Sequence, residues 1–181
     1  MPDLPLPGLP QVYERVKRLK GVVIRGKKLR PDLEVMEFKI APGGRFYVKT
    51  PTAEMYISRK EEITWWPAKK ELIRFNFSGR NPLPAGFEVL WPGGPNLLPN
   101  GKSQSAMFAG KPAVEIPCKH PQGYKVLLYV HPKSLLPLGY INTAWSKERE
   151  IRYLSVDERV ITDREMTFVA PPDAKPHRGP R

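Results

Sequence analysis

The chain contains a single cysteine, Cys118, among its 181 residues. A single cysteine cannot form an intrachain disulfide, so no disulfide framework stabilises the fold and cysteine usage does not indicate a compartment. Cys118 ends a strand-like run at residues 114–118, where we expect a buried, inert thiol rather than a nucleophile.

Long apolar runs are absent as well. No stretch of about 18 apolar residues occurs, so no membrane-spanning helix is expected. Residues 1–8 have neither a basic n-region nor a continuous apolar h-region, so we do not expect them to be a signal peptide. A cytoplasmic protein and an exported protein whose signal has been removed are both compatible with this start.

Residue types suited to catalysis do not cluster in the sequence. His120, His131 and His177 lie far apart, and no His/Cys group has the spacing of a zinc site. The glycine pairs at 43–44 and 93–94 lack the strand–loop–helix setting and the Lys-Ser/Thr ending of a phosphate-binding loop. We therefore expect no enzyme activity, no cofactor and no metal site.

Two pairs of adjacent carboxylates, Glu61-Glu62 and Asp157-Glu158, are the remaining candidates for acid–base chemistry. Neighbouring residues on a strand point to opposite faces, so neither pair can act together on one substrate. We interpret these four residues as solvated turn residues.

Proline and positive charge, by contrast, are abundant. The chain has 22 prolines among its 181 residues, about 12% against an ordinary frequency of ~5%. Their distribution suits stiffened turns better than disorder. The formal net charge of +12 favours nucleic acid, an anionic membrane surface or an acidic protein as a partner. Solubility alone explains the charge equally well.

The apolar pattern predicts one helix near the start and strands thereafter. Val12, Val16 and Leu19 recur at helical spacing after Pro10, and Gly21 suits the end of that helix. From residue 22 to residue 169, short segments alternate apolar and polar residues, which is typical of strands with one dry face. The fold class is therefore mainly β (α+β by count), with a wide, curved antiparallel sheet and little helix to cover it.

At this length we expect one domain over residues 1–181. Residues 1–9 are predicted to be an extended lead-in, and residues 171–181 a basic, proline-rich tail without order. Residues 78–101 form an excursion rich in proline and glycine, and loops of this length are typical of lids or binding loops.

The aromatic residues give the main indication of a site. One short helix cannot cover a wide sheet, so either the excursion at 78–101 closes over the dry face or a largely apolar pocket remains, which is the usual form of a ligand site. The facing of each residue depends on strand register. The predicted lining of this hydrophobic cavity is Met36, Phe38, Phe46, Val48, Ile57, Trp65, Phe75 and Phe77, with Trp91 at the lid.

An alternative is a basic protein- or nucleic-acid-binding module whose sheet interior is filled. Single-strand binders interleave basic and aromatic residues on one sheet face. Here most aromatic residues share a face with aliphatic ones. The exceptions, where basic residues accompany an aromatic residue, are Tyr47 with Lys49 and Trp66 with residues 69–70. Nucleic acid is therefore a less favoured partner than a lipid.

Several segments follow one another in a recognisable order. They are a helix at 12–19, a strand at 21–29, a Pro-Gly turn and aromatic strand at 42–48, a strand–turn–strand at 55–66, runs at 110–116, 128–130 and 135–138, and a closing Phe168 with Pro171-Pro172. This order, over roughly residues 9–174, resembles the outer-membrane lipoprotein-sorting carriers, the LolA/LolB-like group.

The resemblance implies a single incomplete antiparallel β-barrel of about eleven strands, with an N-terminal helix and a lid segment over a hydrophobic cavity. It implies a non-enzymatic carrier, chaperone or sensor in the periplasm or cell envelope, whose ligand is a lipoprotein acyl chain or another lipid. Carriers of this family use an inward arginine to hold the lid, and Arg45 is its nearest counterpart here.

Overall fold

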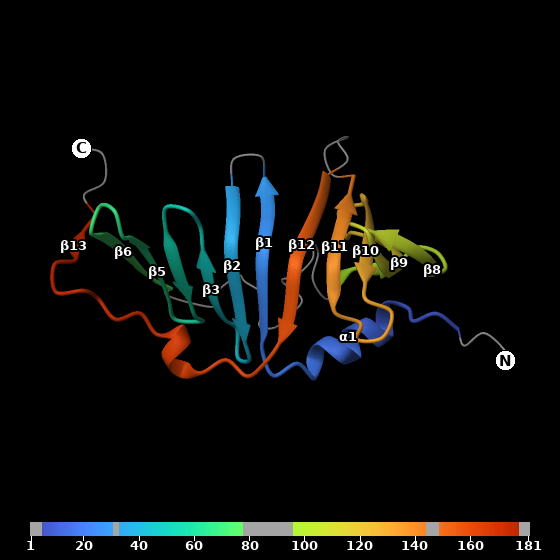
Figure 1. Ribbon diagram of the computed structural model, residues 1–181, viewed down its shortest axis with the longest axis horizontal. Helices are drawn as coiled ribbons and strands as arrows, with labels where there is room; N and C mark the ends of the chain where they lie inside the picture. Colours follow the sequence, from blue (N-terminus) through green and yellow to red (C-terminus); the bar gives the residue numbers. More distant parts are fainter. Residues whose placement is uncertain (1–4, 31–32, 78–95, 144–148, 178–181) are drawn as a thin grey trace. The chain divides into compact units, whose positions relative to one another are not determined.

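The computed structural model describes residues 5–30, 33–77, 96–143 and 149–177 (Figure 1). The chain divides into two compact units. Unit 1 comprises residues 1–19 and 87–156, and unit 2 comprises residues 20–86 and 157–181. Most of the excursion at 78–101, and Trp91 within it, lies outside the described residues. The prediction of a single domain stays a prediction.

Unit 1 contains the single α-helix of the described residues and the second half of the strands (Figure 1). Its elements are α1 (Leu9–Lys17), β7 (Leu98–Pro99), β8 (Gln104–Phe108), β9 (Lys111–Lys119), β10 (Lys125–Val130), β11 (Pro137–Asn142) and β12 (Arg149–Glu158), whose last two residues belong to unit 2. The strand order is β12-β11-β10-β9-β7, and β8 also pairs with β9.

Unit 2 is an antiparallel meander followed by the C-terminal segment. Its elements are β1 (Val22–Arg30), β2 (Leu33–Ala41), β3 (Arg45–Lys49), β4 (Glu54–Ile57), β5 (Glu61–Trp66), β6 (Glu71–Asn76), a 3-10 helix η4 (Asp163–Met166) and β13 (Lys175–Pro176). Strands β1 to β6 pair in chain order, and β13 adds to β6 in parallel.

The predicted fold class is confirmed. The described residues form 13 strands and one α-helix, and the strand order does not close on itself in either unit. Eleven of these strands have four or more residues, whereas β7 and β13 have two each. The count of about eleven strands thus agrees with the longer strands, and the open sheet is consistent with an incomplete barrel.

Helix α1 forms where the apolar spacing predicts it. Pro10 lies in its first turn, and the Gln11 side chain accepts a hydrogen bond from the Gly8 amide at 2.9 Å. Val12 and Val16 are buried. The Arg15 guanidinium donates to the Ser134 carbonyl at 3.1 Å, which ties the helix to the turn between β10 and β11. The helix ends at Lys17, slightly before the end that the apolar spacing predicts.

The centre of one face of the unit 1 sheet, on β9 to β12, is buried. Direct strand partners share a face, and the pairings of β9 with β10, β10 with β11 and β11 with β12 place eight residues together. None of them is more than 8% exposed. We call this the sealed face: Val114, Ile116, Cys118, Val126, Leu128, Val130, Tyr140 and Ile151.

The other face of the unit 1 sheet carries a smaller apolar cluster. The rings of Phe108 and Tyr129 stack with centroids 4.1 Å apart, and the Tyr129 hydroxyl donates to Glu115 at 2.8 Å. Gly139 makes room for this stack: its φ is +151°, and a Cβ there would overlap both the Phe108 ring and the Ile151 carbonyl.

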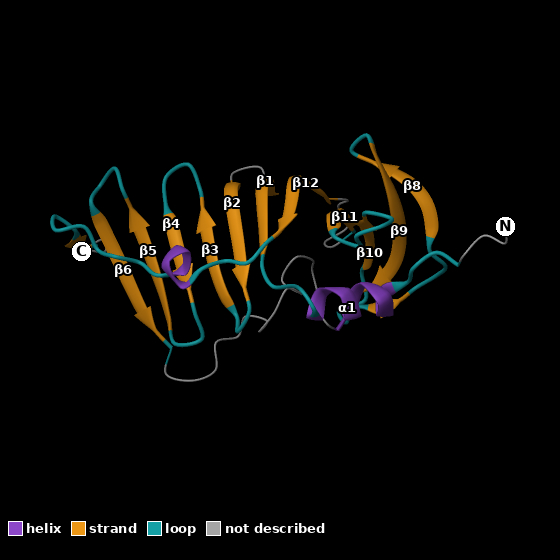
Figure 2. Ribbon diagram, turned by 60° about the horizontal axis from the view of Figure 1, so that its bottom comes forward, coloured by secondary structure: helices purple, strands orange, loops and turns teal. Residues whose placement is uncertain are grey.

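The C-terminal segment of unit 2, residues 159–177, crosses the strands of its own unit (Figure 2). We call it the strap. The prediction is that residues 171–181 lack order, whereas in the structure residues 175–177 run along the start of β6. The Lys175 amide donates to the Lys70 carbonyl and the His177 amide to the Leu72 carbonyl, both at 2.8 Å. These backbone bonds to an edge strand supply the order that the polar composition of the tail does not indicate.

Candidate functional site

Two rows of side chains cross the unit 2 sheet from β1 to β6 on the same face. Each row follows direct strand partners, so its members lie side by side. The first row is Ile24, Phe38, Val48, Met55, Thr64 and Ile73. The second row is Val22, Ile40, Phe46, Ile57, Glu62 and Phe75. We call this surface the apolar face.

Exposure is low at the β1 end of both rows and high at the β6 end. Ile24 is 1% exposed at the β1 end of the first row, and Ile73 is 39% exposed at the β6 end. In the second row, exposure rises from 0% at Ile40 to 59% at Phe75. The side chains on β4 are half-buried. Within these two rows, the apolar face is therefore closed at β1 and β2 and accessible to solvent from β4 to β6.

The structure brings most of the predicted lining residues together. Five of them belong to the two rows: Phe38, Phe46, Val48, Ile57 and Phe75. Met36 shares their face because it lies two residues before Phe38, and Phe77 follows Phe75 in the same way. Met36 is 48% exposed, whereas Phe38 is 9% exposed. Whether these residues line a closed cavity stays a prediction.

Trp65 is the exception among the described residues. It pairs with Glu54 and Leu72 on the opposite face of the sheet, because the register of β4 with β5 aligns Thr64, not Trp65, with Met55. Strand alternation predicts which residues of β5 share a face. It does not predict which face of the sheet this is, because a shift of one residue in the pairing with β4 sends the same residues to the other face. Trp91 lies outside the described residues.

On that opposite face, the strap covers the strands with apolar side chains. The Phe168 ring lies 5.4 Å from the Tyr56 ring and 5.9 Å from the Trp65 ring. Met166 packs against the buried residues Val23 and Ala41. Burial, followed by the neighbouring charge of Glu54, raises the pKa of Tyr56 to about 12.

Ion pairs hold the strap at several points along its length. Glu165 accepts a hydrogen bond from Lys39 of β2 at 3.3 Å, and Asp163 pairs with Arg45 of β3 at 2.5 Å. Within the strap, Arg159 donates to Glu165 at 2.6 Å. The hydrogen bonds from Arg159, and then from the Thr162 amide, hold the pKa of Glu165 well below its ordinary value. Arg45, the suggested counterpart of the family's inward arginine, therefore contacts the strap.

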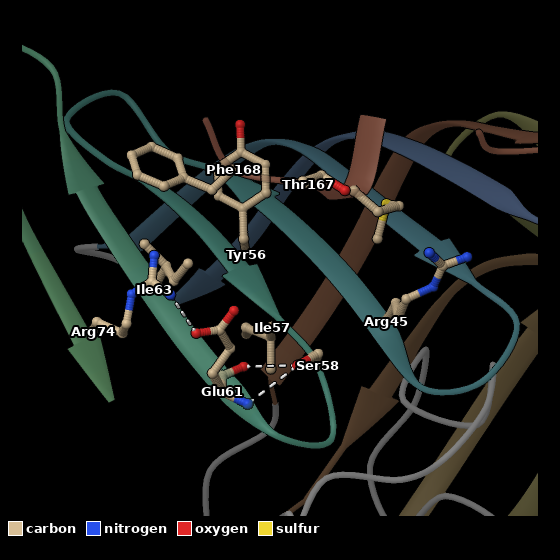
Figure 3. A pocket seen from close by; sticks show the side chains of 10 residues that line it. Arg45, Tyr56, Ile57, Ser58, Glu61, Ile63, Arg74, Thr167 and Phe168 are labelled. Atoms are coloured by element: carbon tan, nitrogen blue, oxygen red, sulfur yellow. Dashed lines mark hydrogen bonds and ion pairs between the residues drawn. The ribbon is translucent and has the colours of Figure 1, made fainter. Parts of the chain in front are cut away.

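A pocket of about 210 Å³ lies on the opposite face, between the strap and the ends of β4, β5 and β6 (Figure 3). Arg45 and Arg74 stand on two sides of it, with Tyr56 and Phe168 at another (Figure 3). Both guanidinium groups already bind carboxylates, since Arg74 donates to Glu61 at 3.0 Å. Because both arginines of this pocket are already paired with carboxylates of the protein, the pocket has no unpaired arginine to offer a ligand. The apolar face is therefore the better candidate for a ligand site.

The apolar face includes residues that the sequence did not single out. Met55 and Ile73 belong to the first row although neither was among the predicted lining residues. Glu61 and Glu62 were expected in a turn but begin β5, where they point to opposite faces as adjacent strand residues must. The alternation of apolar and polar residues in β4 and β6 is the sequence signal that could have indicated Met55 and Ile73 as members of the apolar face.

Within the described residues, no helix is long and apolar enough to cross a membrane. No group of three or more His, Cys, Asp or Glu side chains in the same residues is placed to hold a metal ion.

Comparison with known proteins shows a shared fold. No family model matches the chain, and no curated protein matches it. The structure is similar to that of an uncharacterized conserved protein from Thermus thermophilus, with a TM-score of 0.61 and 13% sequence identity over 94% of this chain and 98% of that chain. At that identity, the similarity shows the fold alone.

A weaker similarity at fold level is to a LolA superfamily protein from Nitrosomonas europaea. The TM-score is 0.39 and the sequence identity 10%, over 90% of this chain and 98% of that chain. The family suggested by the order of segments in the sequence therefore stays a prediction.

Proposed function

We propose that the protein is a non-enzymatic carrier or sensor whose apolar face in unit 2 binds an acyl chain. The observation that supports this most directly is the gradient along the two rows, from fully buried side chains on β1 and β2 to exposed Ile73 and Phe75 on β6. Large apolar side chains that are exposed close together on a folded protein often mark a binding site. The resemblance to lipoprotein-sorting carriers adds the cell envelope and lipoprotein acyl chains to the proposal.

The physical basis is the burial of methylene groups. Each methylene removed from water contributes roughly 0.8 kcal/mol, so a chain of about a dozen can offset an association cost of the order of 4–15 kcal/mol. The rows offer a matching surface: between Val48 on β3 and Ile73 on β6 they cross three strand-to-strand spacings, roughly 14 Å in all. No reacting group is required for this activity.

The test is a charge placed in the middle of the apolar face. Met55 is half-buried and lies between Val48 and Thr64 in the first row. We expect the wild-type protein to bind a fluorescent fatty-acid analogue and Met55→Asp to bind it at least about tenfold more weakly, because a carboxylate would lie unpaired against the acyl chain. Titration followed by fluorescence measures both affinities.

Met107→Asp is the matched control. Met107 also lies on a strand but is 66% exposed and belongs to unit 1. The same substitution there should leave the affinity unchanged, and circular dichroism checks that both variants fold. If the wild-type protein fails to bind the analogue and instead binds polyanions with steep salt dependence, the basic nucleic-acid- or protein-binding alternative replaces this proposal.

A further inference from the structure

The apolar face carries one carboxylate within its two rows. Glu62 stands directly opposite Ile57 on β4 and Phe75 on β6. It is half-buried. Among the described residues it makes no hydrogen bond and no ion pair. A carboxylate in an apolar surrounding loses part of its hydration, and a partner that restores this loss binds there favourably.

Other carboxylates of unit 2 show that this state is unusual. Glu61, the preceding residue, binds Arg74 on the opposite face at 3.0 Å. The other ion pairs are Glu37 with Arg25 and Lys39, Asp157 with Arg25, Glu71 with His177, Asp163 with Arg45, Glu165 with Arg159 and Lys39, and Asp173 with Lys70. Glu54 accepts a hydrogen bond from the Tyr56 hydroxyl at 3.2 Å instead. The chain has 30 Lys and Arg residues, so within the part that the structure describes, the position of Glu62 on the apolar face, rather than a shortage of cations, leaves it without an ion pair.

Aromatic rings lie beside this carboxylate. Phe75, the direct partner of Glu62 on β6, is 59% exposed, and its ring meets the Phe77 ring edge-on with centroids 5.4 Å apart. The negative faces of aromatic rings attract cations, and alkylated ammonium groups most characteristically. A carboxylate next to open aromatic rings therefore has the chemistry of an ammonium site.

We propose that the ligand of the apolar face is an amphiphile whose headgroup carries an ammonium group. Glu62 binds the ammonium, the Phe75–Phe77 pair contacts its alkyl substituents, and the acyl chain lies along the rows toward Val48 and Phe46. This inference rests on the proposed function. A zwitterionic headgroup suits a chain of net charge +12, because it has no net charge to be repelled, and the Glu62 contact lies well inside the screening length of about 8 Å.

The experiment compares two single-chain lipids that share a palmitoyl chain and a phosphate. Lysophosphatidylcholine has a quaternary ammonium group, and lysophosphatidylglycerol has none. Displacement of a fluorescent fatty acid from the full-length protein should show tighter binding of lysophosphatidylcholine by about tenfold. Glu62→Gln should remove this preference by weakening lysophosphatidylcholine alone.

Glu61→Gln is the control, since it changes the neighbouring carboxylate on the opposite face and should leave both affinities as they are. If both lipids bind with equal affinity, or if Glu62→Gln changes both equally, the ammonium site is overturned while acyl-chain binding stands. If neither lipid displaces the probe because no probe is bound, the proposed function fails and the ammonium site fails with it.

Discussion

The two units build apolar faces from the same strand alternation but cover them differently. In unit 1, residues of the sealed face are at most 8% exposed, from β9 across to β12. In unit 2, the rows of the apolar face are closed at Ile24 and Ile40 and open at Ile73 and Phe75. The strand pairing is regular along both rows, so the gradient reflects how much chain covers each strand rather than any break in the sheet.

This difference separates a part of the molecule that stabilises the fold from a part that is available for binding. A fully covered face gives close to the full transfer free energy of each side chain, about 25 cal/mol per Å² of apolar surface. An open face forgoes that contribution when the ligand is absent and recovers it on binding. Stability should therefore depend on the sealed face and ligand affinity on the open rows.

The largest expected effect concerns the reactivity of a thiol on the sealed face. Cys118 is 1% exposed, and burial raises its pKa to about 12, which lowers its thiolate fraction roughly a thousandfold relative to an ordinary thiol. We expect no reaction with a thiol reagent such as DTNB in the native protein and complete reaction in urea. Time-resolved absorbance measures both rates.

A cysteine on the open rows provides the contrast. Phe75→Cys, made together with Cys118→Ala, places the thiol at a position that is 59% exposed in the wild type. It should react within minutes in native protein and more slowly when a fatty acid is bound. Rapid labelling of native Cys118 would show that unit 1 opens readily and would remove the distinction between the two faces.

Truncation of one side chain in each face should give the next largest difference. Leu128 is 0% exposed, so Leu128→Ala leaves a cavity and should cost about 2–5 kcal/mol of unfolding free energy. Ile73 is 39% exposed, so Ile73→Ala should cost about 1 kcal/mol or less. Urea denaturation measures both values. Equal losses would mean that the β6 end of the row is packed as tightly as the sealed face.

The sequence allowed correct prediction of most elements and of which residues share a strand face. The closing strand predicted at 165–169 was wrong, because the 3-10 helix η4 ends at Met166 and residues 167–170 form no strand. Period-two alternation placed Ile63 with Trp65 and Ile73 with Phe75, and helical spacing placed Val12 with Val16. These are local patterns, since each depends on a few consecutive residues. The fold class followed from counting such segments.

The relative facing of different strands could not be predicted in the same way. It depends on register, and the pairing of Met55 with Thr64 sends Trp65 to the face that the strap covers. For the same reason Glu62 lies on the apolar face although its own sequence context, Glu61-Glu62, suggested a turn. The docking of the strap depends on partners such as Lys39 and Arg45, more than a hundred residues away along the chain.

The smallest expected effect concerns how the strap of unit 2 is held, because ion pairs contribute there where unit 1 relies on apolar packing. Glu165 joins the strap to Lys39 of β2 at 3.3 Å, and hydrogen bonds from Arg159, within the strap, keep the pKa of Glu165 below its ordinary value of 4.5. A carboxyl with a lower pKa in the folded state stabilises the fold above pH 4.5 and loses that contribution as pH falls further.

Glu165→Gln should therefore lower the stability at pH 7 by about 1 kcal/mol or less, and the difference from wild type should shrink below pH 4.5. Thermal unfolding at both pH values measures it, with Glu14→Gln on the surface of α1 as the control in unit 1. A difference between Glu165→Gln and wild type that persists unchanged at low pH would show that packing, not charge, holds the strap.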